Sequence, residues 1–288
     1  MITKGIILSG GSGTRMYPTT AAVSKQFLPI FDKPMIYYPL TTLIQSGIRD
    51  ILIICTQNDI DLFKRLLGSG SQWGLNFSYE IQKNPNGIAE AFIIGEKFIS
   101  GQKVALILGD NIIYGATIQT MLSDLASNHK GASIFGYEVS DPERYGVAGF
   151  DDNGILTSIE EKPLRPKSNF AITGLYFYES EVVEIAKGLK PSKRGELEIT
   201  DINNIFLKNN KLHFHRFYPG SAWLDAGTSE SLLSASEFIS TLQDRQGILI
   251  GSPELAALEN GWISKEDIKN FFGSNIKSNY TMQILRRI

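Results

Sequence analysis

Residues 5–15 read Gly-Ile-Ile-Leu-Ser-Gly-Gly-Ser-Gly-Thr-Arg, an apolar run that leads directly into three glycines. The apolar run from Gly5 to Leu8 predicts a short buried strand. Gly10, Gly11 and Gly13 allow a sharp turn that brings backbone N–H groups close to a bound anion. We therefore expect a phosphate-binding loop at the carboxyl end of the first strand of an α/β fold.

This loop departs from the two commonest phosphate-binding patterns. No Lys-Ser or Lys-Thr pair follows at the Walker spacing, and Met16 stands where a dinucleotide fingerprint needs its third glycine. A glycine turn that binds nothing stays open as the alternative, because glycine clusters are common in turns.

Further β-rich apolar runs predict strands at 51–55, 77–81, 104–108 and 132–139. Segments of helical period separate them at 37–46, at 58–67 and at 87–99; Asn58 is the expected cap of the second helix and Gly68 its end. This alternation predicts a doubly wound sheet from residue 3 to about 139, with ligands beyond the carboxyl ends of its strands.

The second half of the chain has a different pattern. Mixed or antiparallel strands are expected at 147–150, 155–160, 172–178 and 212–218, followed by a helix from about 228 to 246. Ser264 with Asp267 forms a capping box that predicts another helix. We expect one α/β domain over residues 1–230 and a helical C-terminal segment over 231–288 that packs on it.

Charge and cysteine content exclude several classes of protein. Among 288 residues, 28 Lys and Arg nearly balance 30 Asp and Glu, so a general nucleic-acid binder is disfavoured and any basic site must be local. The single cysteine, Cys55, lies in an apolar run and predicts a buried thiol. The chain has no signal-like start and no apolar run of about 18 residues, so we expect a cytoplasmic protein.

Acidic side chains at strand ends indicate a metal–phosphate site. Asp110 follows the strand at 104–108, and Asp225 lies in a glycine-bounded turn at 223–227. Mg²⁺ is typically held by one or two carboxylates together with substrate phosphates, which predicts a nucleoside triphosphate or diphosphate. Each Asp alone is also compatible with a helix or turn cap.

Two lysines occur in segments suited to phosphate. Lys25 lies in the run Ser-Lys-Gln-Phe-Leu-Pro, and Lys162 follows Glu161, a carboxylate that suits sugar hydroxyls. Solvated lysines are the alternative in both cases. The histidine pair His213 and His215 has no third ligand nearby in sequence, which disfavours zinc.

Seven motifs together resemble the sugar nucleotidyltransferases, and in particular the bacterial glucose-1-phosphate thymidylyltransferase family. They are GGSGTR at 10–15, SKQFLP at 24–29, LGDN at 108–111, DPERYGV at 141–147, EEKP at 160–163, GELEITD at 195–201 and WLD at 223–225. The resemblance implies a Rossmann-like, doubly wound mixed sheet with a helical C-terminal appendage. It also implies Mg²⁺-dependent formation of dTDP-glucose and pyrophosphate from dTTP and glucose 1-phosphate, by a homotetramer inhibited by dTDP-rhamnose at a second site.

The resemblance also assigns residues to roles. It implies that the catalytic cations are Arg15, Lys25 and Lys162, and that the metal ligands are Asp110 and Asp225. The nucleotide-binding positions it implies are Leu8, Gly10, Gly11, Gly13, Thr14, Arg15, Gln26, Gln82, Pro85, Gly87 and Asp110. The sugar-binding positions it implies are Tyr145, Gly146, Glu161, Lys162, Ile172 and Tyr176.

Three other functions stay open at this point. A related enzyme that uses UTP or another sugar phosphate differs only in its base and sugar pockets. A metal-dependent glycosyltransferase needs an Asp-x-Asp at a strand end, whereas Asp59-Ile60-Asp61 falls at the start of an expected helix. A catalytically dead homologue would bind sugar nucleotides only; the presence of Arg15, Asp110, Lys162 and Asp225 together disfavours it.

Overall fold

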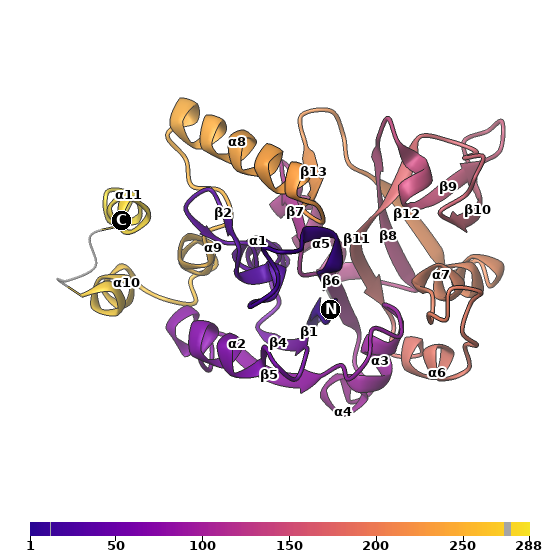
Figure 1. Cartoon of the computed structure of the whole chain (residues 1–288), viewed down its shortest axis with the longest axis horizontal. Coiled ribbons are helices and arrows are strands. Elements are labelled where there is room, and N and C mark those ends of the chain that lie inside the picture. The colour runs from indigo at the N-terminus through magenta and orange to yellow at the C-terminus, as the bar shows by residue number, and fades with distance from the viewer. Residues whose placement is uncertain (12, 274–277) are drawn as a thin grey trace.

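A mixed β-sheet with helices on both faces forms the centre of the chain, as the computed structural model shows for residues 1–11, 13–273 and 278–288 (Figure 1). Its strands are β1 (Lys4–Ser9), β4 (Asp50–Cys55), β5 (Asn76–Ile81), β6 (Val104–Leu108), β8 (Ala132–Glu138), β9 (Gly146–Phe150), β10 (Leu156–Glu161), β11 (Phe170–Tyr178) and β12 (Leu212–Arg216). Two small sheets accompany it, formed by β2 (Pro29–Ile30) with β3 (Lys33–Pro34) and by β7 (Asn111–Tyr114) with β13 (Ala222–Asp225).

The order of the strands confirms the predicted doubly wound mixed sheet. β1 pairs in parallel with β4 and with β6, and β4 pairs in parallel with β5. β11 then lies antiparallel to β6 and to β8, while β12 adds to β8 in parallel. The carboxyl ends of β1, β4, β5 and β6 therefore share one edge of the sheet, where a ligand is expected.

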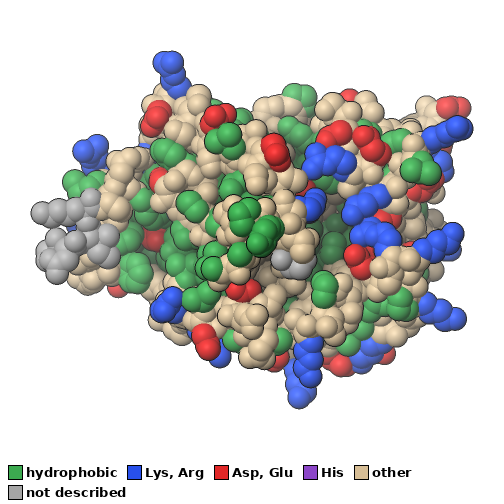
Figure 2. All heavy atoms as spheres, in the orientation of Figure 1, with side chains coloured by type: hydrophobic (Ala, Val, Ile, Leu, Met, Phe, Trp, Pro, Cys, Tyr) green, Lys and Arg blue, Asp and Glu red, His purple; other side chains and the backbone are tan. Residues whose placement is uncertain are grey.

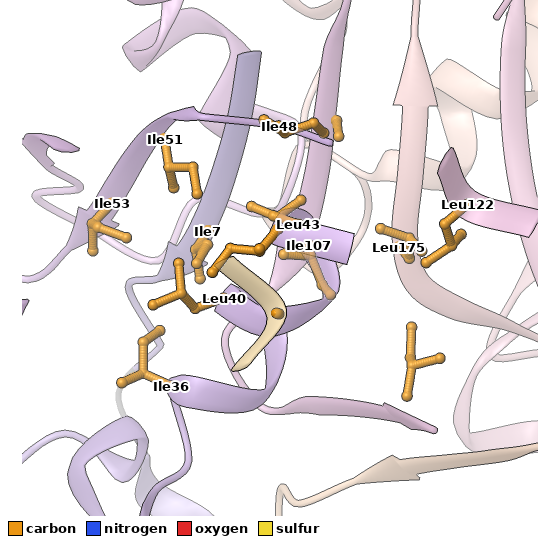
Figure 3. Packing of buried hydrophobic residues seen from close by; sticks show 14 of the residues in the cluster. Ile7, Ile36, Leu40, Leu43, Ile48, Ile51, Ile53, Ile107, Leu122 and Leu175 are labelled. Carbon is orange, nitrogen blue, oxygen red and sulfur yellow. The ribbon is translucent and has the colours of Figure 1, made fainter. Parts of the chain in front are cut away.

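Alternate residues of the buried strands build two separate cores. Ile7 points into the core that contains Leu40 and Leu43 (Figure 3), whereas its neighbours Ile6 and Leu8 belong to the core on the opposite face. This follows from the period of two residues along a strand. Both faces are apolar because helices cover both sides of the sheet.

The two cores lie beneath different sets of helices. On the first face are α1 (Tyr37–Gln45), α2 (Ile60–Leu67) and α5 (Ile118–Asn128); the opposite face carries α3 (Glu90–Ile94), α4 (Glu96–Ile99), α6 (Val182–Lys187) and α7 (Ile199–Lys208). Two helix predictions need correction. The N-cap of α2 is Asp59 rather than Asn58, and the single helix expected over 87–99 is two short ones joined at Gly95.

Two of the C-terminal helices begin where the sequence predicts. α8 (Ser229–Gln246) follows a capping box at Thr228, and α10 (Lys265–Phe272) follows the predicted box of Ser264 and Asp267. Between and after them lie α9 (Pro253–Glu259) and α11 (Asn279–Leu285). α8 packs on β2 through Ile239 and Ile30. The boundary at residue 230 between an α/β domain and a helical C-terminal segment stays a proposal. Within the described residues, no helix has the length and apolar character needed to cross a membrane.

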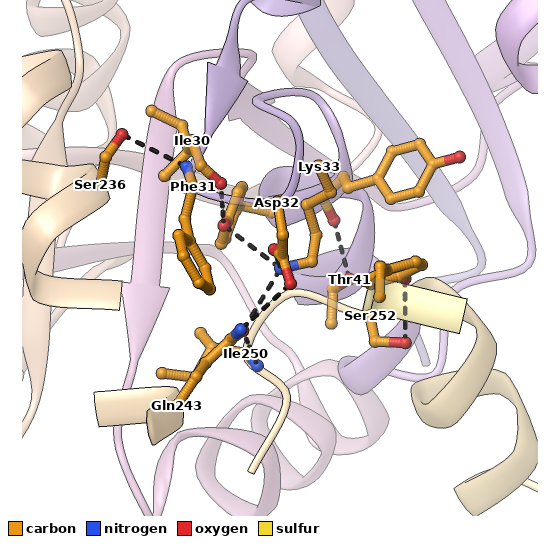
Figure 4. Close-up of polar contacts among 12 residues, drawn as sticks. Ile30, Phe31, Asp32, Lys33, Thr41, Ser236, Gln243, Ile250 and Ser252 are labelled. Atoms are coloured by element: carbon orange, nitrogen blue, oxygen red, sulfur yellow. Dashed lines mark hydrogen bonds and ion pairs between the residues drawn. The ribbon is translucent and has the colours of Figure 1, made fainter. Parts of the chain in front are cut away.

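A buried ion pair within the β2–β3 hairpin is hydrogen-bonded to Gln243 of α8 (Figure 4). Lys33, only 3% exposed, pairs with Asp32 and donates to Gln243 Oε1 of α8 at 3.3 Å. Gln243 in turn donates to Asp32 Oδ2 at 3.1 Å and accepts from the backbone N–H of Ile250 at 2.9 Å. Burial lowers the pKa of Lys33 despite the nearby Asp32 charge. These contacts connect the hairpin that follows Lys25 to α8 and to the loop after it.

We predict that Lys33→Met lowers the free energy of unfolding by about 3–5 kcal/mol, because it leaves the Asp32 carboxylate buried without its cation. Urea denaturation measures the change. The double variant Asp32→Asn/Lys33→Met removes both charges and should recover at least half of the loss. Equal losses in the single and double variants would contradict this account of the pair.

Candidate active site

The glycine loop after β1 ends in a single turn, η1 (Thr14–Met16), which places the Arg15 side chain on the wall of a cavity of about 360 Å³. Gly13 begins this turn in the left-handed conformation, and its carbonyl accepts from Thr20 Oγ1 at 2.7 Å. Ser12 lies outside the described residues. The loop therefore delivers a guanidinium to the carboxyl edge of the sheet.

The pairing of β7 with β13 brings the two predicted metal ligands together. Asp110 directly precedes β7, and Asp225 pairs with Asn111 in the antiparallel register. The backbone N–H of Ala226 also donates to the carbonyl of Asp110 at 3.1 Å. The expected turn at 223–227 is thus wrong in part, because Asp225 is the last residue of a strand. Both carboxylates line the same cavity as Arg15.

The pKa values of the two carboxylates are shifted in opposite directions. Burial, and then the negative charge of Asp110, raise the pKa of Asp225 to about 6. Burial alone would also raise the pKa of Asp110, but the ammonium of Lys25, which forms an ion pair with it, leaves that pKa below its usual value. The pair therefore concentrates negative charge in a buried site where a cation would be stabilised.

Asn111 is a hydrogen-bonding centre that sequence reasoning left without a role. Its Oδ1 accepts from Trp223 Nε1 at 2.6 Å and from the backbone N–H of Gly174 at 2.9 Å, and its Nδ2 donates to Asp110 Oδ1 at 3.1 Å. One buried amide thus joins β7, β11 and β13 and orients the Asp110 carboxylate. In the sequence, the signal for this role was the position of Asn111 directly after Asp110.

All six predicted sugar-binding residues line this cavity. They are Tyr145, Gly146, Glu161, Lys162, Ile172 and Tyr176. Further lining residues that the sequence analysis did not select include Arg144, Thr200, Asn203 and Trp223. On the molecular surface, Lys and Arg side chains gather in the region where β11 and α7 lie (Figure 2), although the net charge of the chain is only −2. The cavity wall itself carries three cations, Arg15, Arg144 and Lys162, beside the acids Asp110, Glu161 and Asp225.

Glu161 is the last residue of β10, Lys162 directly follows it, and both line the cavity. Glu161 accepts from Thr200 Oγ1 at 2.7 Å and from Arg194 at 3.4 Å. Lys162 has a φ of 44°, and its backbone N–H donates to the carbonyl of Tyr145 at 3.0 Å. A left-handed conformation is unfavourable for lysine, so the surrounding structure holds this residue in a strained position beside the site.

A second cavity, of about 190 Å³, adjoins the first at Asp110 and contains most of the predicted nucleotide-binding residues. Those that line it are Leu8, Gly10, Gly11, Gln26, Gln82, Pro85, Gly87 and Asp110, together with Lys25. Gly13 and Thr14 line neither cavity, and Arg15 lines only the larger one. Ile88, Leu108 and Asp110 line both, so the two cavities adjoin at these residues.

At two positions in the smaller cavity, neighbouring atoms lie so close to the backbone that glycine is required. A Cβ on Gly10 would lie 2.1 Å from Oε1 of Gln82. Gly87 has a φ of 110°, and a Cβ there would lie 2.4 Å from the carbonyl oxygen of Leu197. Any larger residue at either position would displace a wall of the cavity.

Other predicted groups lie away from the joined cavities. Asp59 accepts from Thr56 Oγ1 and from the backbone N–H of Ser24, which gives it a structural role in the loop before α2. Burial raises the pKa of the Cys55 thiol to about 12, which confirms the prediction of a buried cysteine. Across the described part of the chain, no cluster of three or more His, Cys, Asp or Glu is placed to hold a metal ion. A metal at Asp110 and Asp225 would therefore need ligands from the substrate.

Comparison with known proteins identifies the relatives of this chain. The nucleotidyl transferase family matches residues 4–241. A glucose-1-phosphate thymidylyltransferase of Neisseria meningitidis is 52% identical over 283 residues, covering 98% of each chain. A protein of the same name from Mycobacterium tuberculosis is 50% identical over 287 residues, covering 99% of each chain.

Solved structures support the same relationship. A structure titled as a glucose-1-phosphate thymidylyltransferase of Bacillus anthracis in complex with a sucrose has a TM-score of 0.76 and 42% identity, covering 82% of this chain and 94% of that one. A UDP-glucose pyrophosphorylase complexed with UDP-glucose has a TM-score of 0.72 and 26% identity, and the match covers 84% of this chain and 99% of that one.

We predict that Asn111→Ala lowers the free energy of unfolding by about 2–4 kcal/mol, because it leaves the buried N–H groups of Trp223 and Gly174 without an acceptor. Urea denaturation monitored by tryptophan fluorescence measures the loss. The matched control is Asn128→Ala at an exposed position of α5, for which we expect a change below about 0.5 kcal/mol. Similar values for the two variants would contradict the central role of Asn111.

Proposed function

Because the chain belongs to the nucleotidyl transferase family, we propose that the two joined cavities transfer a thymidylyl group from dTTP to α-D-glucose 1-phosphate. The products are dTDP-glucose and pyrophosphate. Relatives named for this activity align with the chain over nearly its whole length at about half identity. The observation in the site that carries the proposal is that two pockets of different character meet at one carboxylate, Asp110.

The reaction is an in-line displacement at the α-phosphorus. An oxygen of the sugar phosphate forms a bond to that phosphorus while the bond to the β-phosphate bridging oxygen breaks, and pyrophosphate leaves with the electron pair. A sugar phosphate is already anionic near neutral pH, so no general base is required. This fits a site in which, among the described residues, no histidine lines either cavity.

The cations of the site disperse the charge of this reaction. In the proposal Arg15 and Lys25 face the triphosphate, and Lys162 binds the phosphate of the sugar. Holding both substrates in line lowers the entropy cost of the reaction, and fixed positive charges stabilise the transition state. Glu161 accepts from sugar hydroxyls, and Tyr145 and Trp223 form an aromatic wall with ring centroids 5.1 Å apart.

Asp110 and Asp225 are the residues that would hold Mg²⁺. Their buried, mutually repelling carboxylates fit a divalent cation that takes its remaining ligands from phosphate oxygens. When bound, such an ion neutralises negative charge on the phosphates. The homotetrameric assembly that the family resemblance implies, and the cytoplasmic location expected from the sequence, also belong to this proposal.

A nucleotide panel tests the function. Pyrophosphate release with glucose 1-phosphate and Mg²⁺ should be fastest with dTTP. UTP should be a measurable but poorer substrate, because an apolar contact with one methyl group is worth only about 1–3 kcal/mol. CTP should be rejected much more strongly, because its base presents a different donor and acceptor pattern. A higher kcat/KM for UTP than for dTTP would move the chain to uridylyl transfer.

We further predict that Asp110→Asn and Asp225→Asn each reduce Mg²⁺-dependent turnover by on the order of 10²–10³, because each removes charge that holds the cation at the phosphates. Initial rates measured against Mg²⁺ concentration check this. The control is Asp244→Asn, an exposed acid of α8, which should retain the wild-type rate. Near-normal rates at low Mg²⁺ in either active-site variant would contradict the metal assignment.

A further inference from the structure

The Gln82 side chain is held rigidly in the smaller cavity. Gln82 directly follows β5, is 4% exposed, and donates its backbone N–H to the carbonyl of Cys55 at 2.9 Å. Its amide lies between the glycine loop after β1 and the loop that contains Gly87. The side chain therefore has little freedom of position, and the remaining question is which end of the amide faces a ligand.

Two acceptors fix the orientation of that amide. Nε2 of Gln82 donates to Oε2 of Glu90 at 2.8 Å and to the carbonyl oxygen of Gly87 at 3.2 Å. Carbonyl oxygens only accept, and so does an ionised carboxylate. A flipped amide would place Oε1 against two other oxygens and lose both hydrogen bonds. Both N–H groups of the Gln82 amide are thus occupied by the protein.

The carbonyl end of the amide is the end left for a ligand. Oε1 lies against Gly10 at the cavity wall, where a Cβ on that residue would approach it to 2.1 Å. Within the described ranges of the chain, no donor forms a hydrogen bond with this oxygen. Gln82 consequently offers an acceptor, not a donor, to a base bound in the cavity.

Glu90 is itself held by the loop that it supports. Its other oxygen, Oε1, accepts from Asn86 Nδ2 at 2.8 Å. Among the described residues, no Lys or Arg forms an ion pair with it, so both carboxylate oxygens are used by side-chain amides. The residue before it, Ala89, donates its backbone N–H to Leu197 at 3.2 Å, which fixes the start of α3.

We infer that Glu90 is the positioning residue that makes the site select bases with a donor at N3. Thymine and uracil carry an N3–H that the fixed Oε1 of Gln82 can accept. Cytosine has an unprotonated N3, an acceptor, which would face another oxygen and leave both unpaired. This inference rests on the proposed function: it takes Gln82, a nucleotide-binding position by resemblance that lines the smaller cavity, to contact the base of the nucleotide, and it adds the residue that sets which groups Gln82 can recognise.

The isosteric variant Glu90→Gln tests this inference. Its amide offers a donor as well as an acceptor, so residue 90 no longer opposes a flip of the Gln82 amide and the carbonyl of Gly87 alone still does. We expect the ratio of kcat/KM for dTTP over CTP to fall by about tenfold or more, as for loss of a charge-assisted hydrogen bond. The ratio for dTTP over UTP should stay within about twofold, because these bases share the same edge.

Glu96→Gln is the matched control, since Glu96 is an exposed carboxylate on the neighbouring helix α4 that pairs with Lys187. It should leave both ratios unchanged. An equal loss of activity with all three nucleotides in Glu90→Gln would indicate a purely structural role and overturn the inference. So would an unchanged dTTP-to-CTP ratio. If Glu90→Gln does not fold, Glu90→Ala undergoes the same measurement with the same criteria.

Equilibrium binding separates this inference from the proposed function. Dissociation constants of dTTP, UTP and CTP for the wild type and Glu90→Gln report base selection without turnover. A wild type that releases no pyrophosphate from dTTP and glucose 1-phosphate contradicts the proposed function alone. Binding selectivity that is the same in wild type and variant contradicts the role of Glu90 whether or not the enzyme turns over.

Discussion

Repulsion between Asp110 and Asp225 is the interaction on which the rest of the site depends. The strand pair β7–β13 holds two carboxylates together in a buried cavity, where burial first and then the charge of Asp110 raise the pKa of Asp225. Such an arrangement persists only if surrounding groups overdetermine it. The neighbouring cations and hydrogen bonds are best understood as the groups that make this juxtaposition stable before a metal and phosphates arrive.

The support for this pair extends from the cavity to the far end of the chain. Lys25 pairs with Asp110 and lies just before the β2–β3 hairpin. That hairpin is held to α8 by the buried contacts of Lys33 with Gln243. The C-terminal helices therefore do more than cover apolar surface. Through the hairpin, they help to fix the segment that carries a cation of the active site, although they contribute no residue to either cavity wall.

Sequence patterns predicted the parts of this structure that depend on local order. The continuous apolar run of Ile6, Ile7 and Leu8 predicts a buried strand, and the capping box of Ser264 and Asp267 predicts a helix start. Motif resemblance placed six sugar-site residues that line one cavity. Asn111 was missed because its partners Trp223 and Gly174 lie 112 and 63 residues away. Spacing in a single sequence does not reveal which distant donors an amide will meet.

The two halves of the site are also joined by backbone contacts that no side-chain motif records. The backbone N–H of Leu197 donates to the carbonyl of Asn86 at 2.6 Å, and Leu197 accepts from Ala89 at 3.2 Å. Asn86 lies in the loop between Gln82 and Gly87 at the smaller cavity, while Leu197 follows the segment in which Arg194 contacts Glu161 of the larger cavity. A shift of the Gln82–Gly87 wall would therefore reach the carboxylate expected to bind sugar hydroxyls. The loop at residues 82–87 and the segment at residues 194–197 must both be in place for either cavity to keep its shape. Binding of a nucleotide in the smaller cavity can therefore order the larger cavity for the sugar phosphate.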